Sequence, residues 1–269
     1  MFTGLVVGVL LLLISVFMIF QTTCKVWGAE KPANATQQGI DVSSHQGKID
    51  WEQVKNSALA DYAIIRCGYG VNQTDKDDKY WDYNSSECER LGIPYGTYLY
   101  SGADTTAKAK SEAEHVVRLL QGKNLTYPIY YDMEADMLNQ LSSTQIGNIA
   151  KTFLNTMESY GYKNVAVYSN KYLFETKLTA SVFSDYPKWI AQHSNKCTYQ
   201  GSYHMWQYST QGVIPGISEK VDLNYKIGNW TYAGYSSAKK TVVVKPKATT
   251  IKSLRKSGKK AVKITYKKV

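Results

Sequence analysis

Two acidic residues near the middle of the chain, Asp132 and Glu134, have the spacing of a catalytic pair. They follow Tyr127-Pro128-Ile129-Tyr130-Tyr131, whose aromatic and β-branched residues favour a strand. Residues two apart in a strand point to the same face, so the carboxylates would lie roughly 6–7 Å apart. Such a pair suits a reaction that needs one protonated acid and one charged partner. The alternative is a loop of solvated acids after a strand.

The segments around this pair alternate between strand-like and helix-like patterns. Strands are expected at 38–42, 62–68, 95–100, 128–131, 165–168, 188–191 and 204–208, and helices from Asp50 and at 79–91, 105–121 and 142–160. No long helix is expected between the last two of these strands. The alternation predicts parallel strands with right-handed crossovers, either in a β/α barrel or in an open doubly wound sheet. The sequence lacks the glycine-rich phosphate loops that open sheets often carry.

Polar residues stand where these strands are expected to end. Asp41, Arg66, Tyr100, Asp132 and Asp222 are each assigned to the C-terminal end of a strand. In a β/α barrel those ends share one face, and that face carries the functional site. The pattern therefore favours the barrel and predicts that these side chains gather at one rim.

Several short motifs, in order along the chain, resemble family-25 glycoside hydrolases, which are lysozyme-like N-acetylmuramidases. The motifs are Gly39-Ile40-Asp41-Val42-Ser43, Ala63-Ile64-Ile65-Arg66, Gly96-Thr97-Tyr98, Tyr131-Asp132-Met133-Glu134, Trp189-Ile190-Ala191, Trp206-Gln207-Tyr208 and Val221-Asp222-Leu223-Asn224. Each motif is weak alone, but their shared order over residues 38–230 is specific. The resemblance implies a catalytic domain at 38–232 with a modified TIM-like (β/α)5(β)3 barrel.

The resemblance also implies an activity and its residues. The activity would be hydrolysis of the β-1,4 bond between N-acetylmuramic acid and N-acetylglucosamine in peptidoglycan, without a metal or organic cofactor. Glu134 would be the general acid, Asp132 its charged partner, and Asp41 and Asp222 further acids of the groove. The expected carboxylate separation falls between the retaining and inverting ranges, so both stereochemical courses stay open.

Each further site residue has a structural alternative. Asp41 could instead cap the following loop, and Asp222 could hold another side chain in place. Arg66 could contact substrate or form an ion pair with Asp41 or Asp132. Four aromatic residues could stack on sugar rings or belong to the core; they are Tyr98, Tyr100, Trp189 and Trp206.

Other functions find less support in the sequence. His45 could act as a second base, but a lone loop histidine is usually solvated, and adjacent Ser43, Ser44 and His45 rarely form a triad. A glycan-binding protein without activity is the second hypothesis, although it has no use for an acid pair. An amidase would need a zinc cluster or a Cys/His dyad, and only His193 and Cys197 are neighbours of that kind.

The basic character of the chain belongs to its C-terminal end. The net charge is +10, but residues 239–269 hold 12 of the 32 Lys and Arg residues and no acid. The main body is thus slightly acidic, which argues against a nucleic-acid partner. Residues 233–245 read as a linker, and 246–269 read as an incomplete fibronectin type III-like or wall-associated tail containing a two-stranded hairpin. This short basic β-type tail would bind anionic wall polymer or have no function.

The N-terminal segment predicts export. Residues 5–20 carry no charge, so residues 1–28 read as a signal peptide, or as a membrane anchor if they are retained. We expect a monomer that is secreted or associated with the cell wall. Cys67 and Cys88 could pair in an oxidising compartment, but an odd number of cysteines after this segment does not indicate a disulfide scaffold.

Overall fold

The computed structural model describes residues 29–230, 251–256 and 262–266. The chain divides into two compact units, Met1–Ser237 and Ala238–Val269. Within the described ranges, no helix has both the length and the apolar character needed to cross a membrane. The expected signal peptide or anchor and the expected linker fall outside the described residues.

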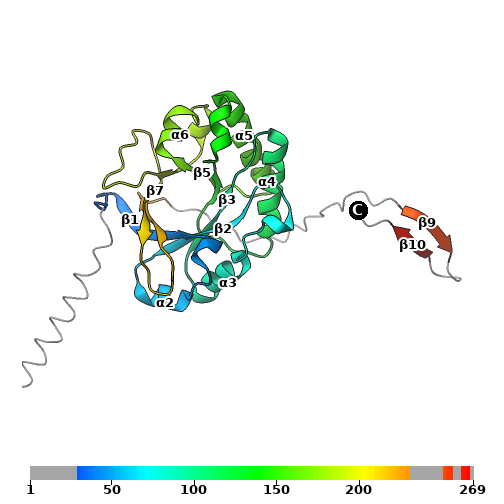
Figure 1. Ribbon diagram of the computed structural model, residues 1–269, viewed down its shortest axis with the longest axis horizontal. Coiled ribbons are helices and arrows are strands. Elements are labelled where there is room, and N and C mark those ends of the chain that lie inside the picture. Colours follow the sequence, from blue (N-terminus) through cyan, green and yellow to red (C-terminus); the bar gives the residue numbers. More distant parts are fainter. Residues whose placement is uncertain (1–28, 231–250, 257–261, 267–269) are drawn as a thin grey trace, which may run out of the picture. The chain divides into compact units, whose positions relative to one another are not determined.

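Eight strands of the first unit close into a barrel, in the order in which they occur along the chain (Figure 1). The strands are β1 (Ala35–Val42), β2 (Tyr62–Tyr69), β3 (Tyr95–Tyr100), β4 (Ile129–Asp132), β5 (Val165–Asn170), β6 (Lys188–Ala191), β7 (Met205–Gly212) and β8 (Val221–Ile227). Neighbours from β1 to β7 are parallel, whereas β8 is antiparallel to both β7 and β1. The closed barrel predicted from the alternation is therefore present.

Helices connect the first six strands. They are α2 (Trp51–Ser57), α3 (Trp81–Leu91), α4 (Thr106–Leu119), α5 (Ser143–Ser159), α6 (Lys171–Thr176) and α7 (Val182–Asp185). Side-chain oxygens of Asp50, Thr105 and Ser142 cap the first turns of α2, α4 and α5, as predicted for Asp50. The sequence analysis missed α6 and α7, because six and four residues are too few to reveal a helical period.

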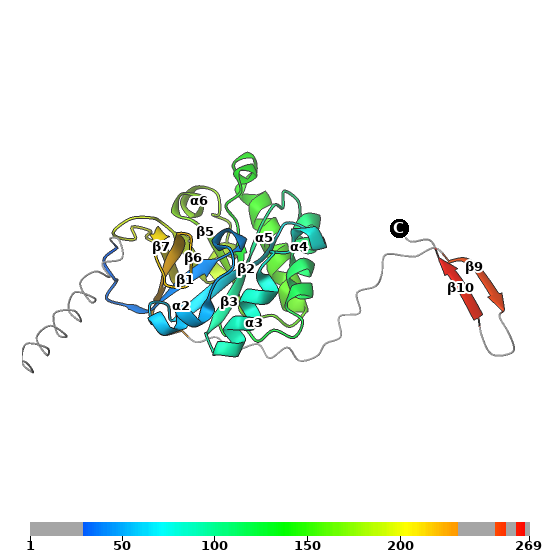
Figure 2. The same cartoon turned by 60° about the horizontal axis from the view of Figure 1, so that its bottom comes forward.

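The helices cover the barrel unevenly. Figures 1 and 2 show α3, α4 and α5 along one side, with β1 and β7 on the other. Within the described residues no helix lies between β6 and β7, as expected. Three short 3-10 helices follow the C-terminal ends of β1, β2 and β4; they are η1 (Ser44–Gln46), η2 (Thr74–Lys76) and η3 (Asp136–Gln140). Those loops build one rim of the barrel.

Aromatic side chains fill the barrel interior. Tyr62, Tyr130 and Trp189 pack in one buried cluster with Met205. The Trp189 ring lies 4.9 Å from that of Tyr130, between centroids. Many of the 22 tyrosines thus serve the core, where a large ring gains the most from burial.

The cysteines do not form the pair that the sequence allowed. Cys67 and Cys88 are free and buried, and Cys197 is free and half-buried. The Cys67 thiol donates to the carbonyl oxygen of Tyr98, and burial raises its pKa to about 12. It therefore behaves as a small core residue, and the Cys67–Cys88 pairing is corrected.

The second unit contains the two strands expected in the tail. They are β9 (Ile251–Lys256) and β10 (Val262–Tyr266), which pair antiparallel. The antiparallel pairing of the two expected strands is confirmed, whereas the relation of the tail to a fibronectin type III-like module stays a prediction.

Candidate active site

The four predicted acids meet around one cavity of about 70 Å³. Its lining residues are Asp41, Tyr98, Asp132, Glu134, Tyr168, Trp189, Gln207 and Asp222. Asp41 lies near the C-terminal end of β1, and Asp132 is the last residue of β4. The cavity therefore lies at the rim where the parallel strands end.

Asp132 and Glu134 face the cavity because an extended backbone continues past β4. The strand ends at Asp132, so Glu134 lies beyond it. The amide of Met133 still donates to the Tyr168 carbonyl at 2.9 Å, and the Ser169 hydroxyl donates to the Met133 carbonyl at 2.6 Å. Met133 itself is buried. The alternation places Met133 in the core and its two acidic neighbours in the cavity.

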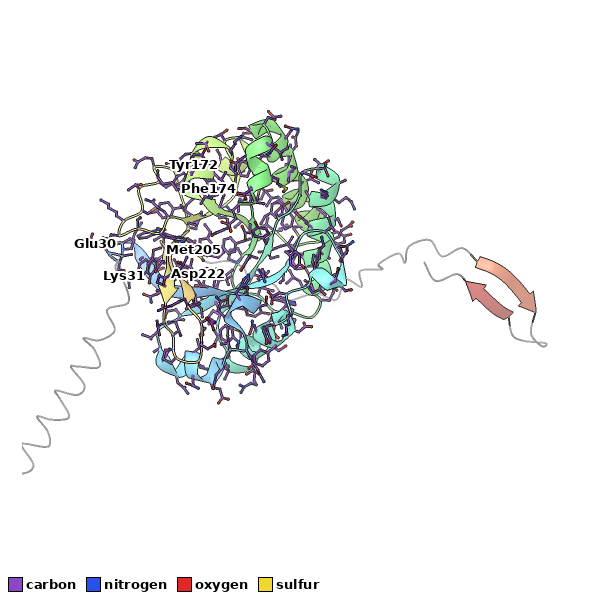
Figure 3. All side chains as sticks on the ribbon, viewed as in Figure 1. Glu30, Lys31, Tyr172, Phe174, Met205 and Asp222 are labelled. Carbon is purple, nitrogen blue, oxygen red and sulfur yellow. The ribbon has the colours of Figure 1, made fainter. Side chains whose placement is uncertain are left out.

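Asp222 reaches the same rim by a route that the sequence analysis did not foresee. It was assigned to the C-terminal end of a strand, but it is the second residue of β8. Because β8 runs antiparallel to β1, its first residues lie beside the last residues of β1, and Asp222 is paired in register with Asp41. Asp222 is therefore not at the C-terminal end of its strand, as was predicted, but it does lie at the predicted rim. Figure 3 shows Asp222 on the side of the barrel where β1 and β7 lie.

Two neutral amides hold the buried Asp41 carboxylate. Asp41 Oδ2 accepts hydrogen bonds from Asn224 Nδ2 at 2.7 Å and from Gln207 Nε2 at 3.0 Å. Asp41 therefore does not cap the loop that follows it; Ser43 caps that turn instead. Amides can stabilise a carboxylate without adding a positive charge to the site.

Three further side chains fix the orientation of those amides. Trp189 Nε1 donates to Asn224 Oδ1 at 2.8 Å. Gln207 Oε1 accepts from the Tyr168 hydroxyl at 3.0 Å and lies 2.9 Å from His193 Nε2. Because an amide oxygen can only accept, His193 must carry its proton on Nε2 in this contact.

Burial and mutual repulsion raise the pKa of every acid in the cavity. For Asp41 the causes are burial and the charge of Asp222, and for Asp132 they are burial and the charges of Glu134 and Asp41. Burial and the charge of Asp41 raise the pKa of Glu134, opposed by the nearby His193 and Tyr168 side chains. Burial raises the pKa of Asp222 to about 6. The cavity therefore favours the protonated form of its carboxyl groups.

Asp132 also has an unused acceptor. Its Oδ1 atom is buried without a hydrogen-bond partner within the described structure. Such an atom is costly unless a ligand or a proton meets it. In the same ranges, no three His, Cys, Asp or Glu side chains are grouped so that they could hold a metal ion.

The comparison with known families gives this acid cavity its context. The sequence model of the glycosyl hydrolases family 25 matches residues 40–217, which include Asp41, Asp132 and Glu134. The chain belongs to glycosyl hydrolases family 25. It is therefore a glycoside hydrolase.

The chain is also similar to individual proteins and solved structures. The autolytic lysozyme of Clostridium acetobutylicum is 30% identical, over 70% of this chain and 55% of its own length. The solved structure of the modular autolysin LytC from Streptococcus pneumoniae has a TM-score of 0.64 and 33% identity, covering 70% of this chain and 46% of LytC. The chain thus matches about half the length of these two relatives. A family-25 hydrolase structure from Bacillus anthracis, 20% identical, shares the fold with a TM-score of 0.65, covering 76% of this chain and 95% of that one.

In this family-25 barrel, Arg66 binds an acid that the sequence analysis missed. Arg66 Nε lies 2.8 Å from Asp78 Oδ2, and its Nη2 donates to the Ser44 hydroxyl at 2.8 Å. The suggested ion pairs with Asp41 or Asp132 are therefore wrong, although the charge of Arg66 does lower the pKa of Asp132. Asp78 stands in the charged run Asp75-Lys76-Asp77-Asp78-Lys79, which gives no sign that one of its members is buried.

The four aromatic residues that could stack on sugar rings lie in different parts of the barrel. Tyr98 and Trp189 line the cavity, but Trp189 is only 1% exposed and belongs to the core. Tyr100 is half-buried and paired in register with Asp132. Trp206 is buried outside the cavity, and its Nε1 donates to the Gln192 carbonyl. Their roles toward substrate stay predictions.

The sequence analysis did not assign four residues of the site, which are Gln207, Asn224, Tyr168 and His193. Gln207 and Asn224 stand in motifs that were quoted, beside the Trp206 and Asp222 that were chosen. Strand alternation carried part of the signal, because Met205 is in the interior cluster and Gln207 must share its face. The sequence marked His193 only as a neighbour of Cys197, which gives no sign that it contacts Gln207.

Proposed function

We propose that this protein is a peptidoglycan hydrolase that cleaves the β-1,4 bond between N-acetylmuramic acid and N-acetylglucosamine, as a lysozyme does. The observation that carries the proposal is one cavity that holds Asp132 and Glu134 together with Asp41 and Asp222. Two relatives are named autolytic lysozyme and lysozyme M1, and LytC has been solved with a synthetic peptidoglycan ligand. We also propose the (β/α)5(β)3 description for the barrel.

Glu134 is the general acid in this proposal. A carboxyl group must keep a proton near neutral pH to protonate the leaving oxygen, and burial with the charge of Asp41 favours the protonated form. Glu134 is also half-buried, so a sugar oxygen can approach it, while Tyr168 and His193 lie near enough to influence its charge. These neighbours stabilise the carboxylate that remains after proton transfer.

Asp132 is the charged partner. Burial and the charge of Glu134 raise the pKa of Asp132, so the two groups titrate as a pair. Positive charge developing on the sugar favours the ionised form of Asp132, which is the state the reaction needs. Asp132 then either orients the substrate's 2-acetamido group, with net retention, or acts as a base on water, with inversion.

Asp41 and Asp222 complete the negative wall of the groove. They face each other in register and carry the charge on the β1–β8 side. The proposal further includes export, with residues 1–28 as signal peptide or anchor, and a monomer whose basic tail (246–269) binds anionic wall polymer.

Product analysis tests the proposed bond. Purified cell wall is digested with the full chain, reduced with borohydride, and hydrolysed for sugar analysis. We expect new reducing ends, recovered as muramitol. Glucosaminitol would instead indicate the other glycosidic bond of the strand, and free amino groups without reducing ends would indicate an amidase. Binding to cell wall without any cleavage would instead favour the alternative function, a glycan-binding protein without activity.

A further inference from the structure

An exposed tyrosine stands at the catalytic rim with no part in the acid cavity. Tyr69 is the last residue of β2 and is 43% exposed, one of three exposed large hydrophobic residues in the described part of the chain. It is paired in register with Tyr100 on β3, and Tyr100 is paired with Asp132 on β4. The three residues therefore form one row across neighbouring strands.

This row leads from the acid pair to the outside of the barrel mouth. Residues paired in register point to the same face of a sheet, so Tyr69 and Tyr100 share the orientation of Asp132. Strands lie about 5 Å apart, which puts Tyr69 roughly 10 Å from the strand of Asp132. Burial and the charges of Asp132 and Glu134 raise the pKa of Tyr100, as expected for a hydroxyl beside the acid pair.

The ammonium group of Lys76 lies near Tyr69, at the outer end of this row. Lys76 Nζ lies 5.9 Å from the centroid of the Tyr69 ring. Across the described residues, no carboxylate lies within ion-pair distance of Lys76. The nearby carboxylate of Asp77 is already bound by Arg118 and His115. Lys76 is thus a half-buried cation that is available to an anionic ligand.

The loop that carries these groups is held firmly to the neighbouring helix. Asp77 Oδ1 lies 2.7 Å from His115 Nε2, and Asp77 Oδ2 accepts from Arg118 Nη1 at 2.9 Å. Arg118 Nε also donates to Asn72 Oδ1 at 2.8 Å, and the Asn72 amide donates to the Ser111 hydroxyl at 3.1 Å. These contacts tie the β2–α3 loop to α4. A surface fixed before binding loses less entropy when a ligand arrives.

We propose that Tyr69 and Tyr100 form an aromatic shelf that binds a sugar ring beside the cleaved bond, and that Lys76 binds a carboxylate of the same glycan strand. This inference rests on the proposed function, and it assigns Tyr69 and Lys76 as residues that recognise substrate. The shelf is continuous with the acid cavity through Asp132, so a strand bound in the cavity passes over it.

The chemistry of peptidoglycan fits both parts of the shelf. A pyranose ring has an apolar C–H face that packs on an aromatic ring, while its hydroxyl groups stay in water. N-acetylmuramic acid and its stem peptide add carboxylates. The ionised carboxylates of the cavity repel such groups, so a cation set aside from the cavity gives the substrate carboxylates a favourable place. Lys76 is placed in this way.

Binding measurements on the full chain test the shelf separately from catalysis. The Glu134→Gln variant serves as the background, which prevents turnover, and isothermal calorimetry measures two ligands of equal length. One is a soluble peptidoglycan fragment with stem peptides, and the other is a chito-oligosaccharide, which has no carboxylate. We expect Tyr69→Ala to lower the affinity for both ligands about tenfold, because a sugar ring of each ligand stacks on the tyrosine ring. Tyr69→Phe keeps the ring and should bind as the background does.

Lys76→Ala should lower the affinity for the peptidoglycan fragment about threefold and leave the affinity for the chito-oligosaccharide unchanged. Lys151→Ala, which removes an exposed lysine from α5, is the matched control and should change neither. Thermal unfolding of each variant verifies that it folds.

Two outcomes would overturn the aromatic shelf: no binding of either ligand by the Glu134→Gln background, or equal binding by Tyr69→Ala and the background. A third outcome, an equal loss of affinity for both ligands in Lys76→Ala, would remove the carboxylate role of Lys76. Shelf-dependent binding by a wild-type protein that releases no reducing ends from cell wall would refute the proposed function and leave the shelf standing.

Discussion

Two clusters of buried and half-buried charged side chains lie at the same rim of the barrel and are built in opposite ways. In the acid cavity, Asp41, Asp132, Glu134 and Asp222 lie together, and their pKa values are raised by burial and by each other. In the β2–α3 loop, Asp77 and Asp78 each meet cationic partners. Burial acts against the charge of Asp77, but hydrogen bonds from Arg118 and His115 lower its pKa overall.

This difference separates a cluster that serves chemistry from one that serves structure. Like charges placed together destabilise the folded state, and they persist where a reaction needs a protonated carboxyl group beside a charged one. Opposite charges with directed hydrogen bonds instead fix a loop in one conformation. Substitutions in the two clusters should therefore change stability in opposite directions.

The largest effect on stability should come from Asp78→Ala in the loop cluster. The Asp78 side chain is fully buried and accepts from Arg66, from the Ser44 amide and from the Tyr80 amide. Its removal leaves Arg66 without its carboxylate partner and two buried amides without their acceptor, which should cost about 3–5 kcal/mol in the free energy of unfolding. Urea denaturation measures this change.

Asp82→Ala is the control for Asp78→Ala, because Asp82 is a mostly exposed carboxylate on the neighbouring helix α3. It should change the free energy of unfolding by less than about 0.5 kcal/mol. Equal effects of the two substitutions would contradict the structural role of the loop cluster.

Asp222→Asn should stabilise the protein, because it removes a charge from the acid cavity. The pKa of Asp222 is raised to about 6 in the folded protein, against about 3.9 in an unfolded chain. Stability from this group is therefore present below pH 4 and is lost as the pH rises through 6. We expect a gain on the order of 2 kcal/mol at pH 7 and almost none at pH 4. A loss of stability at pH 7 would contradict the repulsion that we infer.

Asp77→Asn should show the opposite dependence on pH with a smaller amplitude. A carboxyl group whose pKa is lowered by folding adds stability above its unfolded pKa, and this stability is lost as the pH falls through the folded pKa. The substitution should cost about 1 kcal/mol at pH 7 and progressively less below pH 4. Thermal unfolding at both pH values measures it, and a cost that grows toward acid pH would refute the assignment.

The sequence predicted the barrel and most of its acid cavity from local patterns. Alternating segments indicated the strands and the long helices, because each buries a face with its own period. The helix caps were readable in the same way, as Asp50 illustrates. Asp132 and Glu134 could be assigned because the two-residue spacing puts both on one side of an extended backbone.

What the sequence could not supply depended on contacts between distant segments. Strand direction is a tertiary property, so Asp222 was given the wrong end of its strand. The burial of Asp78 depends on Arg66 in β2 and on Ser44 in η1, and a run of five charged residues looks solvated without them. Gln207 and Asn224 became visible as site residues only when Asp41 was placed between them.

The release of reducing ends from peptidoglycan by wild type and by Glu134→Gln tests the central claim most directly. Glu52→Gln, an exposed glutamate on α2, serves as the control. We predict that Glu134→Gln lowers the rate at least about a hundredfold, the usual scale for a general acid, with thermal stability unchanged or raised. Glu52→Gln should keep the wild-type rate. A wild-type rate in Glu134→Gln would contradict the account.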